Sequence, residues 1–212
     1  MKKIITFLIA FFAVFSIQAK PSYKGTVKPV IMIDAGHGGL DIGTKGRRPY
    51  CEEKRIALST AILTKKYLDQ LGYKCVLTRS TDVFLPLATR VKKANVARSS
   101  LFISLHYNHS PNATAHGIEI FYCDAKNSKK IAVASQRLAS NVLKQVIKRT
   151  KAKSRGVKKG NFYVIRETKI PAVLLEGGFI SNDNERTNLK NSKYIDKIAR
   201  GIADGVDRYF KS

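Results

Sequence analysis

Three predicted buried strands are each followed, at the point where the strand ends, by a side chain that can bind a metal or move a proton. These residues are His37 after residues 30–33, His106 after residues 101–105, and Glu176 after residues 172–175. A fourth candidate, Glu53, opens a predicted helix that can face the same end of the sheet. Because functional sites of open α/β sheets lie at the carboxyl ends of the strands, we expect the four side chains to meet there.

Two imidazoles and a carboxylate form a set that binds catalytic zinc and leaves a fourth position for water. Zinc lowers the pKa of that water to about 7, and a further carboxylate beside it can shuttle the proton. A plainer interpretation also fits, because every α/β protein has polar residues at its strand ends. Glu52 and Glu53 likewise form a favourable acidic pair at a helix N-terminus. Spacing alone leaves both interpretations open.

The elements that must position these residues alternate between strand and helix patterns. Further strands are predicted at residues 74–78, 117–122 and 161–165. Helices are predicted over residues 53–71, 87–97, 131–146 and 195–209. No repeat or low-complexity linker interrupts them, so residues 28–212 are expected to form one domain. We predict an α/β fold whose mostly parallel twisted sheet carries helices on both faces.

Composition limits the class of protein and points to its surroundings. The chain has 212 residues, 44% hydrophobic and 25% charged, which is ordinary for a folded domain and too apolar for disorder. Its net charge of +24 indicates an anionic neighbour, such as nucleic acid, anionic lipid or an acidic polymer. Cys51, Cys75 and Cys123 are too widely spaced for a zinc finger or redox dithiol. One pair could bridge in an oxidising compartment, while Cys75 is expected to be a small buried hydrophobe.

The start of the chain favours export. Lys2 and Lys3 are followed by an apolar run of 14 residues, 4–17, and Ala19 offers a small residue to signal peptidase. We predict a signal peptide over residues 1–19 and a short polar lead over residues 20–27. Removal of two lysines leaves a mature chain of charge +22 in the periplasm or cell envelope. An uncleaved anchor is the alternative, although the apolar run is short for a bilayer span of about 20 residues.

Four motifs in order carry the candidate residues. They are Asp34-Ala35-Gly36-His37-Gly38-Gly39, Glu53-Lys54, Ser104-Leu105-His106-Tyr107-Asn108, and Glu176-Gly177-Gly178-Phe179-Ile180-Ser181-Asn182. Together they closely resemble the zinc-dependent N-acetylmuramoyl-L-alanine amidases of the Amidase_3 family, and the resemblance runs from about Val30 to Phe210. It also takes in Thr78-Arg79 with Asp82, and Leu87 with Arg90, Ala94 and Asn95.

The resemblance implies one Zn²⁺ ion held by His37, Glu53 and His106, with Glu176 as the catalytic glutamate. Glu53 is chosen over Glu52 because Glu53-Lys54 reproduces the family's Glu-Lys pair. The implied reaction is hydrolysis of the amide between the lactyl group of N-acetylmuramic acid and the L-alanine of the stem peptide. Its substrate is peptidoglycan or a muropeptide, and zinc-activated water attacks with Glu176 carrying the proton.

One departure from the family concerns regulation. Several members carry a long helical insertion between the second histidine and the catalytic glutamate, which blocks the site until an activator binds. Here His106 and Glu176 are 70 residues apart, and one strand, one helix and two further strands account for nearly all of that length. We therefore expect no blocking helix and an enzyme that is active without an activator.

Lysine and arginine cluster within residues 126–130 and 148–159. The clusters fit attraction to an anionic envelope surface and equally fit a solvated face that keeps the protein soluble. Three functions compete with the amidase: a zinc peptidase trimming the stem peptide, a non-catalytic envelope-binding protein, and a secreted nucleic-acid binder. The last is supported by charge alone and has no recognition motif, so we expect no nucleic-acid partner, and we expect a monomer.

Overall fold

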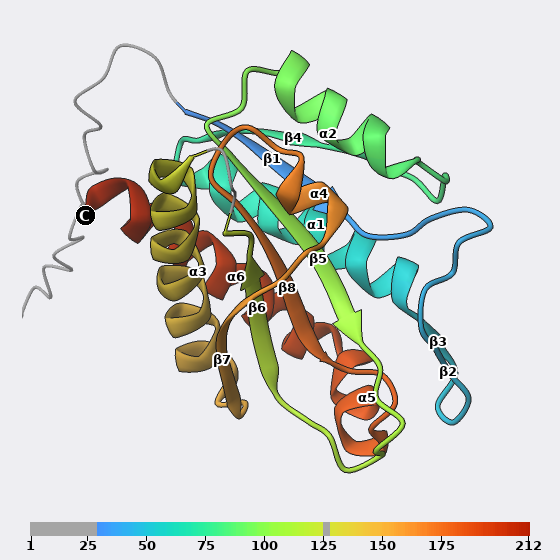
Figure 1. Ribbon diagram of the computed structural model, residues 1–212. Coiled ribbons are helices and arrows are strands. Elements are labelled where there is room, and N and C mark those ends of the chain that lie inside the picture. The colour runs from blue at the N-terminus through green and yellow to red at the C-terminus, as the bar shows by residue number, and fades with distance from the viewer. Residues whose placement is uncertain (1–28, 125–127) are drawn as a thin grey trace, which may run out of the picture.

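A six-stranded sheet forms the centre of the protein (Figure 1). The structure is a computed structural model that describes residues 29–124 and 128–212. In chain order the strands are β1 (Val30–Ala35), β4 (Lys74–Leu77), β5 (Leu101–Asn108), β6 (Ile118–Tyr122), β7 (Ser154–Lys159) and β8 (Ala172–Phe179). Across the sheet their order is β4-β1-β5-β8-β6-β7.

Four of these strands, β4, β1, β5 and β8, run parallel to one another. Strand β6 pairs antiparallel with β8, and β7 pairs parallel with β6, so β6 and β7 both run in the opposite direction. A separate two-stranded hairpin joins β2 (Lys45–Gly46) to β3 (Cys51–Glu52). The predicted mostly parallel sheet is thus confirmed, with a reversal at one edge.

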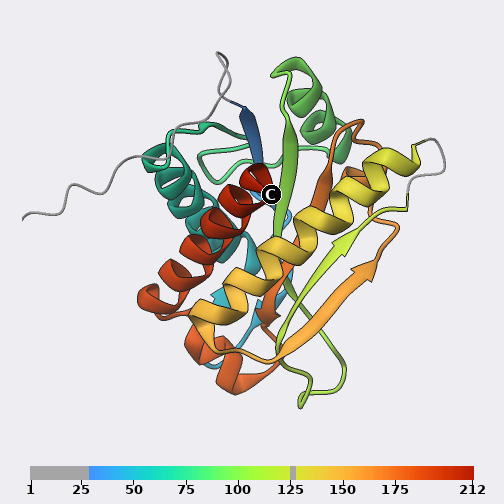
Figure 2. The same cartoon turned by 90° about the vertical axis from the view of Figure 1, so that its left-hand side faces the viewer.

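Helices cover both faces of the sheet (Figures 1 and 2). One face carries α1 (Glu53–Gln70), α3 (Lys129–Thr150) and α6 (Ser192–Lys211). The other carries α2 (Leu87–Val96) and the short α4 (Tyr163–Arg166). A further short helix, α5 (Asp183–Leu189), follows β8.

Alternation along the strands fills the two core layers. In β1, Ile31 and Ile33 pack into the layer under α1, α3 and α6, while Met32 between them packs into the layer under α2 and α4. All three are fully buried. Because both faces of the sheet are covered, such strands show up in the sequence as continuous apolar runs, which made β1, β5 and β8 predictable.

The predicted strand over residues 161–165 is wrong, because this segment contains α4. Val164 and Ile165 are neighbours in sequence and both are buried in the same core layer, which strand alternation does not allow. The amide of Arg166 donates to the carbonyl of Phe162 at 3.0 Å. This is a hydrogen bond within a helical turn and not one between neighbouring strands. Periodicity cannot distinguish strand from helix in an apolar run this short.

Four elements are missing from the sequence prediction: the two-residue strands β2 and β3, the edge strand β7 and the helix α5. β7 lies at the sheet edge and is only partly buried, and its basic sequence hides the strand alternation. The N-cap of α5 is Asn182, whose side chain accepts a hydrogen bond from the Glu185 amide at 3.0 Å. That Asn and the Glu three residues later are a helix-start signal that could have revealed α5.

Several predictions concern residues or features away from the core. The signal peptide over residues 1–19 and the lead over residues 20–27 lie outside the described residues. All three cysteines are free, and Cys75 is buried as predicted. Within residues 29–124 and 128–212, no helix has the length and apolar character needed to cross a membrane.

Two glycines let α6 approach α3 closely. A Cβ atom added at Gly205 would lie 2.4 Å from the Cα of Val142, and one added at Gly201 would lie 2.6 Å from the Cα of Val146. Both contacts are with helix backbone, which cannot rotate away as a side chain can. The two helices therefore pack at a separation that only glycine permits at these positions.

We expect Gly205→Ala to lower the free energy of unfolding by about 1–3 kcal/mol, because overpacking outweighs the better helix propensity of alanine. Chemical denaturation would measure this. Lys197→Ala, at an exposed position of the same helix, is the matched control and should change stability little. Equal midpoints for the two variants would contradict the close packing.

Candidate active site

His37 lies in the tight turn that follows β1. Its backbone is left-handed, with φ of 60°, and Gly38 and Gly39 also have positive φ. Nδ1 of His37 lies 2.9 Å from both carboxylate oxygens of Asp41, which orients the ring. Nε2 then faces Glu53 Oε1 at 2.9 Å. The sequence analysis did not identify Asp41 as a partner of His37. Its position four residues after His37 was the one feature of the sequence that pointed to this contact.

His106 comes from β5 and faces the same carboxylate. Its Nδ1 lies 2.9 Å from Glu53 Oε1, and its ring meets that of His37 edge to face with centroids 4.8 Å apart. The ring also lies against Gly36, where a Cβ atom would come within 2.4 Å of Cε1. Glycine at position 36 is therefore part of what lets the two imidazoles converge.

Glu53, the first residue of α1, is 4% exposed. Its Oε1 accepts from the Tyr107 amide at 3.1 Å and its Oε2 from the Thr44 amide at 2.8 Å. Burial raises the pKa of this carboxyl, but the hydrogen bonds and charges of the two imidazoles outweigh burial and hold the pKa well below its usual range. Glu53 is therefore an anion at neutral pH.

Glu52 lies outside this cluster. Its carboxylate accepts from the Tyr50 hydroxyl and from Arg55 Nε, the latter at 2.9 Å. Of the two adjacent glutamates, Glu53 is the one that faces the histidines.

Glu176 stands on β8, where it is paired with His106 in the sheet register. Burial, followed by the charges of Glu53 and Glu119, raises the pKa of its carboxyl well above the ordinary value. Its Oε2 atom is buried and has no hydrogen-bond partner among the described residues. Since buried polar atoms are normally paired, this oxygen is free to bond a ligand or water.

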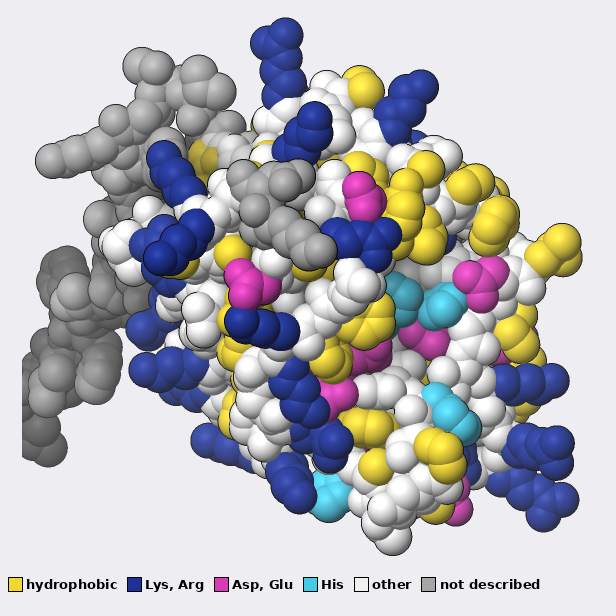
Figure 3. Space-filling view, in the orientation of Figure 1, with side chains coloured by type: hydrophobic (Ala, Val, Ile, Leu, Met, Phe, Trp, Pro, Cys, Tyr) yellow, Lys and Arg dark blue, Asp and Glu magenta, His cyan; other side chains and the backbone are white. Residues whose placement is uncertain are grey.

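The structure thus brings the four predicted residues together at one end of the sheet. Ligand atoms of His37, Glu53 and His106 all lie within 4.8 Å of one another. In Figure 3, two histidine side chains lie at a hollow with acidic side chains beside them. His116 does not join the cluster, because its Nδ1 lies 2.8 Å from the carbonyl of Thr114 within its own loop.

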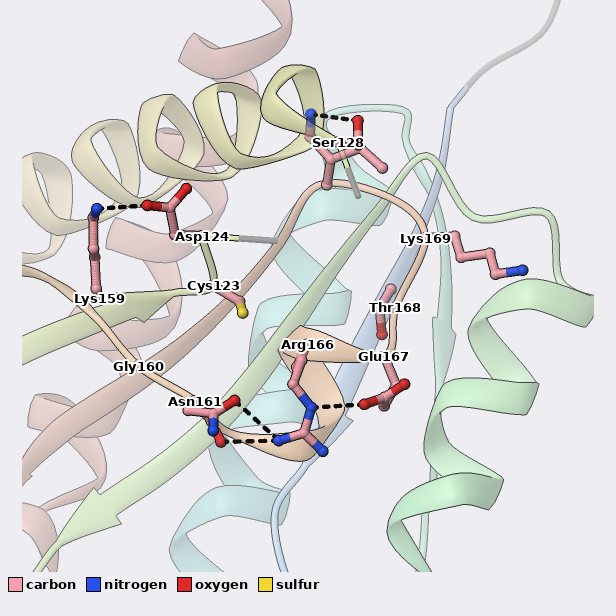
Figure 4. A pocket seen from close by; sticks show the side chains of 11 residues that line it. Cys123, Asp124, Ser128, Lys159, Gly160, Asn161, Arg166, Glu167, Thr168 and Lys169 are labelled. Atoms are coloured by element: carbon pink, nitrogen blue, oxygen red, sulfur yellow. Dashed lines mark hydrogen bonds and ion pairs between the residues drawn. The ribbon is translucent and has the colours of Figure 1, made fainter. Parts of the chain in front are cut away.

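A pocket of about 1150 Å³ lies at the opposite end of the sheet (Figure 4). It is bordered by the ends of β6 and β7 and by the segment that precedes β8. Four of its charged side chains form two pairs, Lys159 with Asp124 at 2.5 Å and Arg166 with Glu167 at 2.6 Å. The pocket is therefore separate from the histidine cluster.

The sequence matches the family model of N-acetylmuramoyl-L-alanine amidase over residues 31–208. The chain belongs to this family. It is 37% identical over 180 residues to the uncharacterised protein YqiI of Bacillus subtilis, covering 85% of this chain and 84% of that one. It is 37% identical over 189 residues to the N-acetylmuramoyl-L-alanine amidase LytC of Bacillus subtilis, covering 87% of this chain but 36% of LytC.

Solved amidase structures share the fold. The catalytic domain of the amidase CwlV from Bacillus (Paenibacillus) polymyxa has a TM-score of 0.80 and 38% identity, covering 86% of this chain and 98% of that domain. An N-acetylmuramoyl-L-alanine amidase from Clostridium difficile 630 has a TM-score of 0.82 and 33% identity, covering 87% and 98%. These matches confirm the predicted family, fold class and enzyme class.

In this amidase, a buried ion pair supports the turn that carries His37. Asp34 Oδ1 accepts from Arg90 Nη1 at 2.9 Å and from the Thr78 hydroxyl at 2.7 Å, and its Oδ2 accepts from the Ser104 hydroxyl at 2.8 Å. Arg90 also donates to the carbonyls of Ala35 and His37, at 2.6 and 2.8 Å. The pair therefore holds the left-handed backbone of His37 in place.

Arg79 and Lys54 hold the same turn from another side. Arg79 donates to the carbonyls of Ala35, Gly36 and Lys54 at 2.7–2.9 Å. Lys54 Nζ donates to the Gly39 carbonyl at 2.8 Å and to Asp82 at 2.7 Å. The Glu53-Lys54 pair thus joins a residue that faces the histidines to one that fixes their loop.

We expect Arg90→Ala to lower the free energy of unfolding by about 3–5 kcal/mol, because it leaves the Asp34 carboxylate buried without its cation. Lys92→Ala, at an exposed position of the same helix, is the control and should be near neutral. Thermal and denaturant unfolding of both variants would measure the difference. A loss below about 1 kcal/mol for Arg90→Ala would contradict the role given to the pair.

Proposed function

We propose that His37, Glu53 and His106 hold one zinc ion, with which this domain hydrolyses the amide between N-acetylmuramic acid and the L-alanine of the stem peptide. The substrate is peptidoglycan or a muropeptide. The observation that carries the proposal is the convergence of two imidazoles on one ionised, buried carboxylate. Two histidines and a glutamate are a donor set of catalytic zinc sites, in which a further position stays open for water.

The residues present fit the ion. Asp41 accepts the Nδ1 proton of His37, so Nε2, which faces Glu53, is the nitrogen that would lose its proton to bind the ion. The side chains of His37 and His106 are 22% and 19% exposed, so a substrate can reach them. When bound, zinc lowers the pKa of water and polarises the carbonyl oxygen under attack.

Glu176 moves the proton in this proposal. Its Oε2 takes a proton from the attacking water and delivers it to the amine nitrogen of L-alanine as the carbon–nitrogen bond breaks. Burial and the charges of Glu53 and Glu119 raise the pKa of Glu176 well above its ordinary value, which favours a carboxyl that exchanges a proton during the reaction. Glu53, whose pKa is shifted the other way, stays ionised and keeps its place as a ligand.

We propose further that the domain needs no activator. Between β5 and β8 the described helices are α3, which packs against α6 and β6, and α4, which packs against α2 and β8. Both are parts of the two core layers. The partial exposure of both histidines fits an open site.

The place of action belongs to the same proposal. The predicted signal peptide over residues 1–19 supports export to the periplasm or cell envelope, where the substrate lies. The net charge of +24 supports attraction to an anionic envelope surface. We propose that the enzyme acts there as a monomer.

Metal analysis tests the proposed ligands without an activity assay. We expect one zinc per chain in the purified protein, and loss of that zinc in His37→Ala and in His106→Ala, because two ligands hold the ion poorly. Glu176→Gln should keep the zinc, since its carboxyl is not among the proposed ligands. Full zinc content in both histidine variants would contradict the assignment of His37 and His106 as zinc ligands.

Product mass tests the reaction. Zinc-loaded mature chain and a purified muropeptide, with no other protein, should give free stem peptide beginning at L-alanine. A chelator should abolish the product, and Glu176→Gln should lower kcat by about 10²–10⁴-fold.

Each alternative outcome has its own meaning. A shortened stem still attached to the sugar would identify a zinc peptidase. Turnover that begins only when a partner protein is added would contradict independence of an activator. No product with zinc restored would point to an envelope-binding protein.

A further inference from the structure

Glu119 lies next to Glu176 on the neighbouring strand β6, where the two residues are direct register partners. It is 4% exposed. Its carboxylate accepts from Asn108 Nδ2 at 2.7 Å, from Arg155 Nε at 2.7 Å and from Lys158 Nζ at 2.6 Å. One carboxylate shared by two cations leaves a net charge of +1 beside the proposed catalytic carboxyl.

Arg155 is held rigidly in this cluster. Its Nε is bonded to Glu119, its Nη1 reaches the His116 carbonyl at 3.4 Å, and its guanidinium carbon lies 4.8 Å from the centre of the Phe179 ring. Nη2 bonds to no residue of the described chain, and the side chain remains 29% exposed. A guanidinium fixed on two sides with an open N–H group is preorganised to bind a carboxylate.

The sheet register places this cluster along a line that starts at the histidines. His106 pairs with Glu176, Glu176 pairs with Glu119, and Arg155 lies on the next strand between the partners of Ile118 and Ile120. Adjacent strands are about 4.8 Å apart, so the backbones of β8 and β7 are about 10 Å apart. An extended peptide covers that distance in about three residues.

The other side of the site has a different character. Four exposed hydrophobic side chains form an apolar rim beside the His37 turn: Leu40, Val83, Phe84 and Leu87. Phe84 is close to this turn, since a Cβ added at Gly39 would lie 2.7 Å from its amide nitrogen. The charges there, Lys54 and Asp82, are paired at 2.7 Å. Figure 3 shows hydrophobic side chains on one side of the hollow and basic side chains on another.

We propose that Arg155, held by Glu119 and assisted by Lys158, binds a carboxylate of the stem peptide and so directs the peptide across β6 and β7. The uncharged sugar then lies toward the apolar rim. The proposal rests on the proposed amidase function, and it makes Arg155 a residue that determines specificity. The stem peptide carries carboxylates close to its L-alanine end, which is the chemistry that Arg155 recognises.

Two synthetic muramyl tripeptides test this, identical except that the stem carboxylates are free in one and amidated in the other. The unaltered enzyme should favour the free form in kcat/KM by at least about tenfold, mainly through KM, because the charge-assisted bond is lost in the amide. Arg155→Gln should bring the ratio of kcat/KM for the free and amidated forms close to one, mainly by raising KM for the free form. Arg155→Lys, which keeps the charge, should keep part of the preference.

Lys159→Gln is the matched control, because it removes the same charge from the same strand at a residue that pairs with Asp124 instead. It should keep the full preference. Zinc content and melting temperature of every variant report whether the site is intact. Equal kcat/KM of the unaltered enzyme on the two substrates would overturn the proposal, and this comparison does not depend on the folding of any variant.

Two further outcomes separate this proposal from the proposed function. An equal loss on both substrates in Arg155→Gln, with zinc retained, would show that Arg155 is only structural. If neither substrate is turned over, the amidase assignment fails, and calorimetric binding of both tripeptides to the zinc-loaded chain decides the proposal. Equal affinities would then overturn it, and tighter binding of the free form would support it.

Discussion

Asp34 and Arg90 form an ion pair that is almost wholly removed from solvent, at 1% and 2% exposure. Burying two charges costs several kcal/mol per ion unless hydrogen bonds replace the lost water. Here the hydroxyls of Thr78 and Ser104 complete the shell of Asp34, and the remaining N–H groups of Arg90 go to backbone carbonyls, including that of His37. The left-handed turn after β1 is therefore fixed by a buried and extensively hydrogen-bonded ion pair. The position of His37, and through it the whole cluster, depends on this pair.

Two carboxyls a short distance apart in this site are driven to opposite protonation behaviour by their surroundings. Glu53 faces two imidazoles and two backbone amides, which favour its anion despite burial. Among the described residues Glu176 has no donor at Oε2, and the anion of Glu53 adds to the cost of a second negative charge. Separation of two pKa values in this way is how one site obtains both a permanent anion and a proton carrier. The side chains around each glutamate, and not the glutamates themselves, assign these roles.

The sequence is sufficient for the sheet's buried strands and for the four motif residues, because both produce strong local patterns. Strands β1, β5 and β8 are covered on both faces and give apolar runs, and His37, His106 and Glu176 follow directly from where those runs end. Asp41, Asp34 and the arginines were not predictable as supports, since their partners are backbone carbonyls and side chains distant in sequence. The segment of α4 was misassigned because four residues carry too little periodicity, and β7 was missed because an edge strand needs little apolar surface.

The reversal of direction at β6 explains why part of the site escapes motif reasoning. His37 follows β1, and His106 and Glu176 lie in the carboxyl-terminal halves of β5 and β8, as expected for a site of a parallel sheet. Because β6 and β7 run the other way, the same sheet edge receives residues near the beginnings of these strands, Glu119 and Arg155. Each is the second residue of its strand, so a search at the ends of apolar runs does not find them. The antiparallel strands β6 and β7 thus bring a second group of side chains to the site, opposite in charge to the glutamates of the first group. The contrast in charge across the site follows from this topology.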